Sequence, residues 1–153
     1  MNATATETST SVPLKLWVVM SRAYDAIRRN VEAQIASEGL TTTEFGILEV
    51  LHHKGPLLLG EIQRKVLVTS GGTTYLVDRL AEKGLVKREE CPSDRRARYA
   101  VLTTEGSELI GRVFPKHAQA LRKILSGLTR EEQLEATKLM KKLGLAADAL
   151  MNE

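Results

Sequence analysis

The sequence predicts a mainly α-helical fold with a small β wing: a winged helix-turn-helix flanked by long helices from both ends of the chain. Three observations lead to this prediction. Apolar residues recur at helical spacing along most of the chain. A short helical segment, a tight turn and a longer helical segment precede a β-hairpin pattern, which is the order of a winged helix-turn-helix. The flanking segments carry more apolar surface than one small domain covers, which favours pairing with a second copy.

Composition narrows the protein class. The chain has 153 residues, of which 42% are hydrophobic and 27% charged, so we expect one globular domain rather than a disordered chain or a coiled-coil rod. The single cysteine, Cys91, excludes an internal disulfide framework and a cysteine-rich zinc site. No apolar run is long enough to span a membrane, and a reducing cytoplasm is the expected setting. The net charge of +3 permits a polyanionic partner without requiring one.

The N-terminal part predicts a tail and two helices. Residues 1–12 lack the basic start and apolar run of a signal peptide, and we expect a flexible tail. A helix over 13–37 is predicted by apolar residues in steps of three and four, namely Trp17, Met20, Tyr24, Ile27 and Val31. A Thr-x-x-Glu capping box at Thr41–Glu44 begins the next helix, which Gly55-Pro56 ends near His53.

The central segment predicts the winged core. Residues 57–59 suit a small strand, and 60–66 a short helix. The next helix is expected to begin at Thr69 or Ser70 and to end at Lys83, with Gly84 as a left-handed cap. Residues 85–90 and 98–102 alternate weakly around a turn at 91–96, which predicts a hairpin.

Two more helices complete the domain. Thr103 or Thr104 caps a helix that contains Pro115 and ends at Gly127, and a second capping box at Thr129–Glu132 begins the last helix. We therefore expect a domain over 13–150, with the winged core at about 41–104. The dimerisation helices are expected at about 13–37 and 104–150.

The longer helix of the central pair is the candidate for reading DNA. A recognition helix contacts bases mainly with its first turns, and its N-terminus favours phosphate. The candidate DNA-contacting residues on this helix are Ser70, Gly71, Gly72, Thr74, Tyr75 and Arg79. Acidic residues share the same side, so a plain solvent-facing helix remains an alternative.

The hairpin tip adds basic residues. Arg95, Arg96 and Arg98 lie within four positions, and the narrow minor groove of DNA attracts arginine. The alternative is a solvated turn in which one arginine pairs with Asp94. We expect both uses: one arginine stabilises the loop and another contacts DNA.

An ordered set of residues around this hairpin resembles the MarR family of bacterial transcriptional regulators. The resemblance rests on Val77–Val86, Arg88, Pro92–Arg96 and Val101–Gly106. The helical layout fits the family over roughly 13–150. The resemblance implies a homodimer that binds double-stranded DNA at a pseudo-palindromic operator, in a bacterial cytoplasm near the nucleoid. It also implies repression of efflux, detoxification or stress genes, relieved by a small, often aromatic, molecule or by cysteine oxidation.

The resemblance assigns individual roles. It places Gly71, Gly72 and Tyr75 in the base-reading part of the helix, and Arg96 in the minor groove. Arg95 with Asp94 matches the pair that shapes the wing. Many relatives have arginine where this chain has Tyr75, so the base preference at that position is open.

Candidate sensors follow. Four segments, beginning at Leu14, Thr43, Thr74 and Cys91, look like a subgroup that responds to quinones and related electrophiles. Around Cys91, neighbouring arginines favour the thiolate while Glu89 and Glu90 oppose it, and an unreactive turn cysteine is the alternative.

The family's effector pocket lies between the dimer helices and the winged lobe. Its candidate lining residues, each also suited to core packing, are Trp17, Met20, Tyr24, His53, Phe114 and His117.

Other functions have less support. We expect no cofactor and no metal site, because His52 and His53 point about 100° apart on a helix. No nucleophile–base pairing, phosphate loop or metal signature supports an enzyme. The remaining alternative is a helical interaction module whose winged lobe binds protein rather than DNA. Salt discriminates the two, because phosphate contacts make affinity fall steeply with ionic strength.

Overall fold

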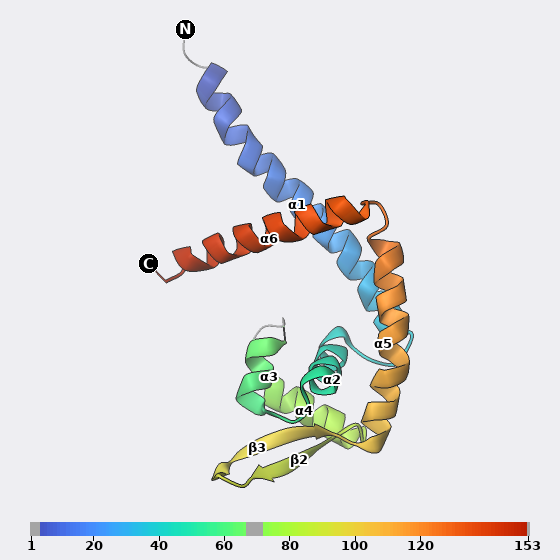
Figure 1. The fold of residues 1–153 in the computed structure, drawn as a ribbon. Helices are drawn as coiled ribbons and strands as arrows, with labels where there is room; N and C mark the ends of the chain where they lie inside the picture. Colours follow the sequence, from blue (N-terminus) through green and yellow to red (C-terminus); the bar gives the residue numbers. More distant parts are fainter. Residues whose placement is uncertain (1–3, 67–71, 153) are drawn as a thin grey trace. The chain divides into compact units, whose positions relative to one another are not determined.

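The computed structural model describes residues 4–66 and 72–152, with side chains from residue 11 onward (Figure 1). The elements in chain order are α1 (Thr4–Ala36), α2 (Thr42–Lys54), β1 (Leu57–Leu58), α3 (Leu59–Lys65), α4 (Thr73–Glu82), β2 (Val86–Cys91), β3 (Asp94–Leu102), α5 (Thr104–Ile124) and α6 (Arg130–Leu150). They form two compact units, residues 1–120 and residues 121–153. The mainly helical class with a small β wing is confirmed.

Two helices begin elsewhere than predicted. Helix α1 begins at Thr4 and contains Pro13, which was expected in its first turn at the end of a tail over 1–12. Proline removes one backbone donor, and here the helix continues through it. Helix α4 begins at Thr73 rather than at 69 or 70, and Gly72 is its N-cap. Glycine is a poor helix former, which accounts for the later start.

The predicted caps are present where short sequence motifs specify them. The Glu44 backbone N–H donates to Thr41 Oγ1 at 3.1 Å, and Thr41 N–H donates to Glu44 Oε2 at 3.3 Å. Thr129 and Glu132 make the same reciprocal pair at the start of α6, in the second unit. Gly84 follows α4 with φ of 73°, the left-handed conformation that glycine adopts without strain.

The sheet is antiparallel in the order β1-β3-β2, and the β2–β3 hairpin is the wing. Cys91 pairs with Asp94, so the connection is only Pro92-Ser93 rather than the predicted turn over 91–96. Glu90 pairs with Arg98, which leaves residues 95–97 as extra residues on β3. A β-bulge of this kind bends a strand and turns its side chains outward. Arg95 and Arg96 are exposed in this bulge.

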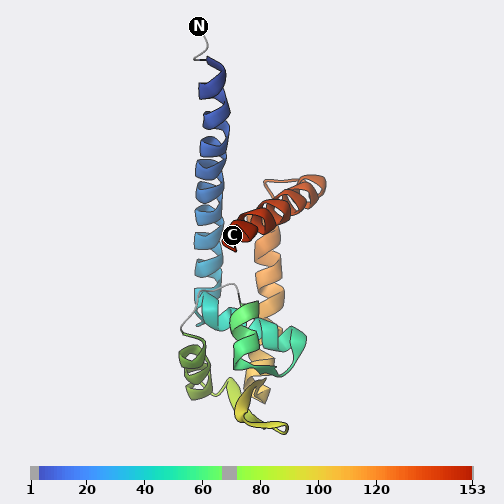
Figure 2. The ribbon, with the colours of Figure 1, turned by 90° about the vertical axis from the view of Figure 1, so that its left-hand side faces the viewer.

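The core of the first unit lies between the C-terminal end of α1, helices α2, α3, α4 and α5, and the sheet. Its largest fully buried side chains are Ile35, Ile47, Leu48, Ile62, Val77, Leu80, Ile110 and Val113. Val77 and Leu80 hold α4 against this core by its apolar face. Both views place α4 and the wing at the end of this unit away from the N-terminus of α1 (Figures 1 and 2).

Each unit also leaves apolar side chains exposed. In the first unit these are Tyr75 of α4 and, on α1, Val12, Leu14, Leu16, Trp17, Val18, Val19 and Tyr24. In the second unit they include Leu134, Leu139, Met140, Leu143, Leu145 and Leu150, and none of the α6 residues in the described part of the chain is buried. Over residues 4–66 and 72–152, no helix has the length and hydropathy required to cross a membrane.

Candidate functional site

Helix α4 presents a polar face to solvent. Thr74, Tyr75 and Arg79 are exposed, and the Tyr75 side chain is 63% accessible although it is aromatic. Their exposure follows from the helical period, because the buried pair Val77 and Leu80 occupies the opposite side. Ser70 and Gly71, also predicted to contact DNA, lie outside the described residues.

The wing is shaped by Arg98 and Asp94 rather than by a pair of Arg95 with Asp94. Arg98 Nη1 donates to the carbonyl oxygens of Arg95 at 2.7 Å and Ala97 at 3.1 Å, and its Nη2 lies 3.6 Å from Glu90 Oε1. Asp94 Oδ1 accepts the backbone N–H of Arg96 at 2.9 Å. The carboxylate thus binds the backbone of the bulge. Within the described residues, neither Arg95 nor Arg96 has a side-chain ion pair.

An ion pair joins the wing to α4. Arg88 Nη2 on β2 lies 2.8 Å from Asp78 Oδ1 on α4, with both side chains partly exposed. On the same strand, Lys87 Nζ lies 3.0 Å from Glu89 Oε1. The Arg88–Asp78 pair links the wing to the exposed face of α4, and both pairs partly neutralise cations near the hairpin.

Cys91 lies at the end of β2 and is buried, with 8% of its surface accessible. Its Sγ is 3.2 Å from Ser93 Oγ. The hydrogen bond from the Ser93 side chain lowers the pKa of the Cys91 thiol most, the backbone N–H groups of Ser93 and Asp94 and the Tyr99 hydroxyl add to it, and burial opposes it. The sequence left the direction open, with arginines set against Glu89 and Glu90, and the structure shows that hydrogen bonds rather than these charges lower the pKa. In return, Cys91 raises the pKa of Tyr99.

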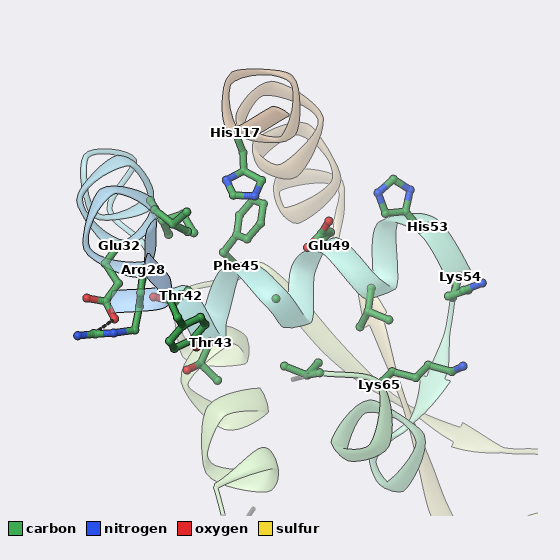
Figure 3. Close-up of a pocket in the computed structure, with 16 residues that line it drawn as sticks. Arg28, Glu32, Thr42, Thr43, Phe45, Glu49, His53, Lys54, Lys65 and His117 are labelled. Carbon is green, nitrogen blue, oxygen red and sulfur yellow. Dashed lines mark hydrogen bonds and ion pairs between the residues drawn. The ribbon is translucent and has the colours of Figure 1, made fainter. Parts of the chain in front are cut away.

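A cavity of about 790 Å³ lies between α1, α2, the end of α3 and α5, all within the first unit (Figure 3). It is lined by Tyr24, Arg28, Val31, Glu32, Ile35, Thr42, Thr43, Phe45, Gly46, Glu49, Val50, His53, Lys54, Lys65, Val66 and His117. Three of the six predicted lining residues are among these: Tyr24, His53 and His117.

The other three predicted lining residues lie elsewhere. Trp17 is 64% exposed and Met20 half-buried, because both precede the part of α1 that borders the cavity. Phe114 packs edge-on against His53, with ring centroids 4.8 Å apart, and stays outside the cavity lining. The sequence analysis did not predict the charged lining residues Arg28, Glu32, Lys54 and Lys65. The helical spacing of Tyr24, Arg28, Val31 and Ile35 is the signal that places Arg28 on the same face.

The walls of the cavity combine an aromatic pair with charged rims. The His117 ring lies 4.6 Å from that of Phe45, and His117 Nδ1 is 3.0 Å from Gln34 Oε1. Burial lowers the pKa of His117, opposed by the Glu49 carboxylate, so the neutral ring is favoured. Arg28 is held by Glu32 at 2.6 Å and Asp25 at 2.7 Å. In Figure 3, Lys54 and Lys65 lie toward the opposite rim.

A metal centre has no structural support in the described ranges. Across residues 4–66 and 72–152, no group of three or more histidine, cysteine, aspartate or glutamate side chains is placed to hold an ion. The His52 and His53 rings pack edge-on, with centroids 5.2 Å apart.

Comparison with known proteins places this arrangement among DNA-binding regulators. A model of the MarR family matches residues 38–97. The HTH-type transcriptional regulator MhqR of Bacillus subtilis is 40% identical over 144 residues, which are 94% of this chain and 99% of the relative. The HTH-type transcriptional repressor MdtR of the same organism is 30% identical over 82% of this chain and 81% of the relative. The crystal structure of Sco3205, a MarR family transcriptional regulator from Streptomyces coelicolor in complex with DNA, superposes with a TM-score of 0.79. That match has 28% identity and covers 86% of this chain and 84% of the other.

Proposed function

The chain belongs to the MarR family of transcriptional regulators, and on this premise we propose that it is a homodimeric repressor that leaves its operator when a small aromatic or electrophilic molecule acts on it. The observation that carries the proposal is the pairing of two exposed elements at one end of the first unit. These are the polar face of α4 and a wing whose Arg95 and Arg96 are exposed.

We assign base reading to α4 and minor-groove contact to the wing. Thr74, Tyr75 and Arg79 project from the exposed side of α4, where hydroxyl and guanidinium groups suit base edges and phosphates. Arg96 is the wing residue proposed to enter the minor groove, with Arg95 beside it. Arg98 is assigned to the shape of the wing, because its guanidinium already binds two carbonyls.

We propose that the exposed apolar faces of α1 and α6 pair with a second copy. Large apolar patches on a protein surface mark interaction sites, and a two-fold dimer buries the same patch on both copies. A dimer also presents two α4 helices, which a pseudo-palindromic operator requires.

We propose that the cavity beneath α1 and α2 binds the effector. It has the size of a small-molecule site and pairs apolar walls with a few polar groups. The second route to release is addition of the Cys91 thiolate, whose pKa is lowered, to a quinone ring carbon, in keeping with the resemblance to quinone-responsive relatives. A C–S bond forms and the thiol proton passes to a quinone oxygen, which leaves a hydroquinone thioether on the wing. The protein is expected to act on promoter DNA in the bacterial cytoplasm, without catalysis of its own.

A gel shift with the DNA upstream of the protein's own gene tests the proposal. We expect a salt-sensitive shift that Arg96→Ala weakens and Arg112→Ala leaves unchanged. Arg112 is the control because it is an exposed arginine on α5, outside both α4 and the wing. A simple quinone is expected to abolish the shift. Retained quinone sensitivity in Cys91→Ser assigns the response to the cavity, and lost sensitivity assigns it to the thiol. No salt-sensitive binding to this or any other promoter DNA would overturn the proposed function.

A further inference from the structure

A close contact between α2 and the end of α3 lies in the wall of the cavity. A Cβ on Gly46 of α2 would lie 3.2 Å from Cγ1 of Val66, the residue that caps the C-terminus of α3. Both residues line the cavity. Gly46 stands inside α2, where alanine would be the better helix former. Its lack of a side chain is what allows Val66 to lie this close to α2.

This contact positions the end of α3. Val66 N–H donates to the Ile62 carbonyl at 2.9 Å, and the Ile62 side chain is fully buried in the core. Val66 is half-buried and packs against the same core. Ile62 thus anchors the middle of α3, whereas Val66 holds its end on α2. Because α3 also packs against α4, the position of its end affects the helix that we propose reads DNA.

The other walls of the cavity are joined to one another. The His117 ring of α5 lies 4.6 Å from the Phe45 ring of α2, and His117 Nδ1 is 3.0 Å from Gln34 Oε1 of α1. Among the described residues, α3 and its cap contribute Lys65 and Val66 to the cavity wall (Figure 3). Lys65 is exposed, so Val66 supplies the packed contact. The α3 wall is therefore the one that a bound molecule displaces most easily.

Val66 has one direction in which to move. Its approach to Gly46 leaves no room for movement toward α2, and close-packed groups yield by displacement rather than by compression. A planar ring that enters the cavity against Val66 therefore pushes the end of α3 away from α2. A ligand shifts an equilibrium only when it binds one state better than the other, and the ring fits the displaced state better.

We propose that Val66 is the positioning residue through which the cavity controls α4. An effector with a planar ring enters against Val66 and separates it from Gly46, and α3 passes this displacement to α4. The inference rests on the proposed function and adds to it the contact that transmits the effector's action to the DNA-binding face.

Gly46→Ala imitates the effector from within the protein. The added methyl requires Val66 to shift by a few tenths of an ångström, while alanine favours the helical backbone of α2. Binding to the DNA upstream of the protein's own gene is followed by fluorescence anisotropy without any effector. We expect Gly46→Ala to bind about tenfold more weakly, a typical size for coupling between two sites. The double variant with Gly46→Ala and Val66→Ala is expected to regain most of the lost affinity, because the smaller side chain makes room for the methyl.

Gly111→Ala is the matched control, because it adds the same methyl to an exposed helical site with open space around it. Val66→Ile enlarges the other partner of the contact and is expected to weaken DNA binding as well, which keeps the test available if Gly46→Ala does not fold. Circular dichroism at the assay temperature verifies each fold. Wild-type affinity in folded Gly46→Ala, or no recovery in the double variant, would overturn the role of Val66 and leave the proposed function intact. Wild-type protein without salt-sensitive DNA binding would instead overturn the proposed function.

The effector response provides a second readout. In the Cys91→Ser background, 1,4-benzoquinone acts without the thiol, and its effect is the ratio of DNA affinities measured without and with the probe. We expect Val66→Ala to bring this ratio close to unity, because the ring no longer displaces the shortened side chain. An unchanged ratio would overturn the proposed link. A Cys91→Ser protein that does not respond would overturn it too, because the effector would then not act through the cavity.

Discussion

Lys83 Nζ lies 2.8 Å from Oε2 and 3.0 Å from Oε1 of Glu44, and so joins the end of α4 to the first turn of α2. The Glu44 side chain is 4% exposed and that of Lys83 is 36% exposed. The same carboxylate also closes the capping box with Thr41. One buried side chain thus starts the helix that lines the cavity and holds the C-terminal end of the helix proposed to read DNA.

A double-mutant cycle measures this link. Lys83→Met leaves the buried carboxylate without its cation, so we expect it to lower the free energy of unfolding more than Glu44→Gln, which keeps the cap. The double variant is expected to lose about 1 kcal/mol less than the sum of the two single losses. The coupling is this small because solvent reaches the Lys83 side chain and screens its attraction to Glu44. Urea unfolding at fixed protein concentration gives the values. Additive losses would show that the two groups do not stabilise each other.

Gly106 and Gly111 predict opposite effects of the same substitution within α5. A Cβ on Gly106 would lie 1.9 Å from the backbone oxygen of Leu85, which also accepts the Thr103 N–H at 3.1 Å. Backbone cannot yield as a side-chain tip does, so Gly106→Ala is expected to destabilise the fold by about 3 kcal/mol. Gly111 is exposed with open space around it, and Gly111→Ala is expected to stabilise α5 by about 0.5–1 kcal/mol. Thermal melting that shifts both variants in the same direction would contradict this account.

Local motifs made most of the fold predictable. A capping box requires two residues three apart, so the starts of α2 and α6 follow directly from Thr41–Glu44 and Thr129–Glu132. Gly84 after α4 is equally local. The beginning of α4 is harder to predict, because the capping residues Thr69 and Ser70 are followed at once by the poor helix formers Gly71 and Gly72.

The sites depended on contacts that no local pattern encodes. Arg98 acquires its structural role only because the bulge at 95–97 brings two carbonyls within its reach. Lys65 and Arg28 line one cavity although 37 positions separate them in the chain, and only packing of α1 and α3 around α2 brings them together. The charges next to Cys91 in the sequence oppose one another and predict no direction for its pKa, whereas folding supplies the hydrogen bonds from Ser93 and Tyr99 that lower it.

The reactivity of Cys91 with pH tests those hydrogen bonds. Only the thiolate reacts with an alkylating agent, so a lowered pKa moves the midpoint of the rate–pH profile below that of a free cysteine. We expect Ser93→Ala to move the midpoint up, because it removes the largest contribution, and Tyr99→Phe to move it up by less. The midpoint is the quantity to compare, since burial slows the reaction at every pH. A midpoint unaffected by Ser93→Ala would assign the lowered pKa to another cause.

Tyr75 is expected to determine base preference without changing the electrostatic part of binding. Its side chain is neutral and exposed on the first turns of α4. Selection of bound sequences from a randomised duplex pool compares wild type, Tyr75→Ala and Tyr75→Arg. We expect Tyr75→Ala to lose preference at one position of each half-site, at about 1–3 kcal/mol, and Tyr75→Arg to prefer guanine there through its O6 and N7.

The salt slope separates this role from a contact made by a cationic side chain. On a duplex of arbitrary sequence, Tyr75→Ala is expected to keep the wild-type slope, because no cation is removed, whereas Arg96→Ala is expected to reduce it. Tyr75→Phe serves as the control for the ring, since it removes only the hydroxyl. Identical selected sequences for wild type, Tyr75→Ala and Tyr75→Arg would show that Tyr75 does not contact bases, and the reading of DNA by α4 would then have to rest on Thr74 and Arg79.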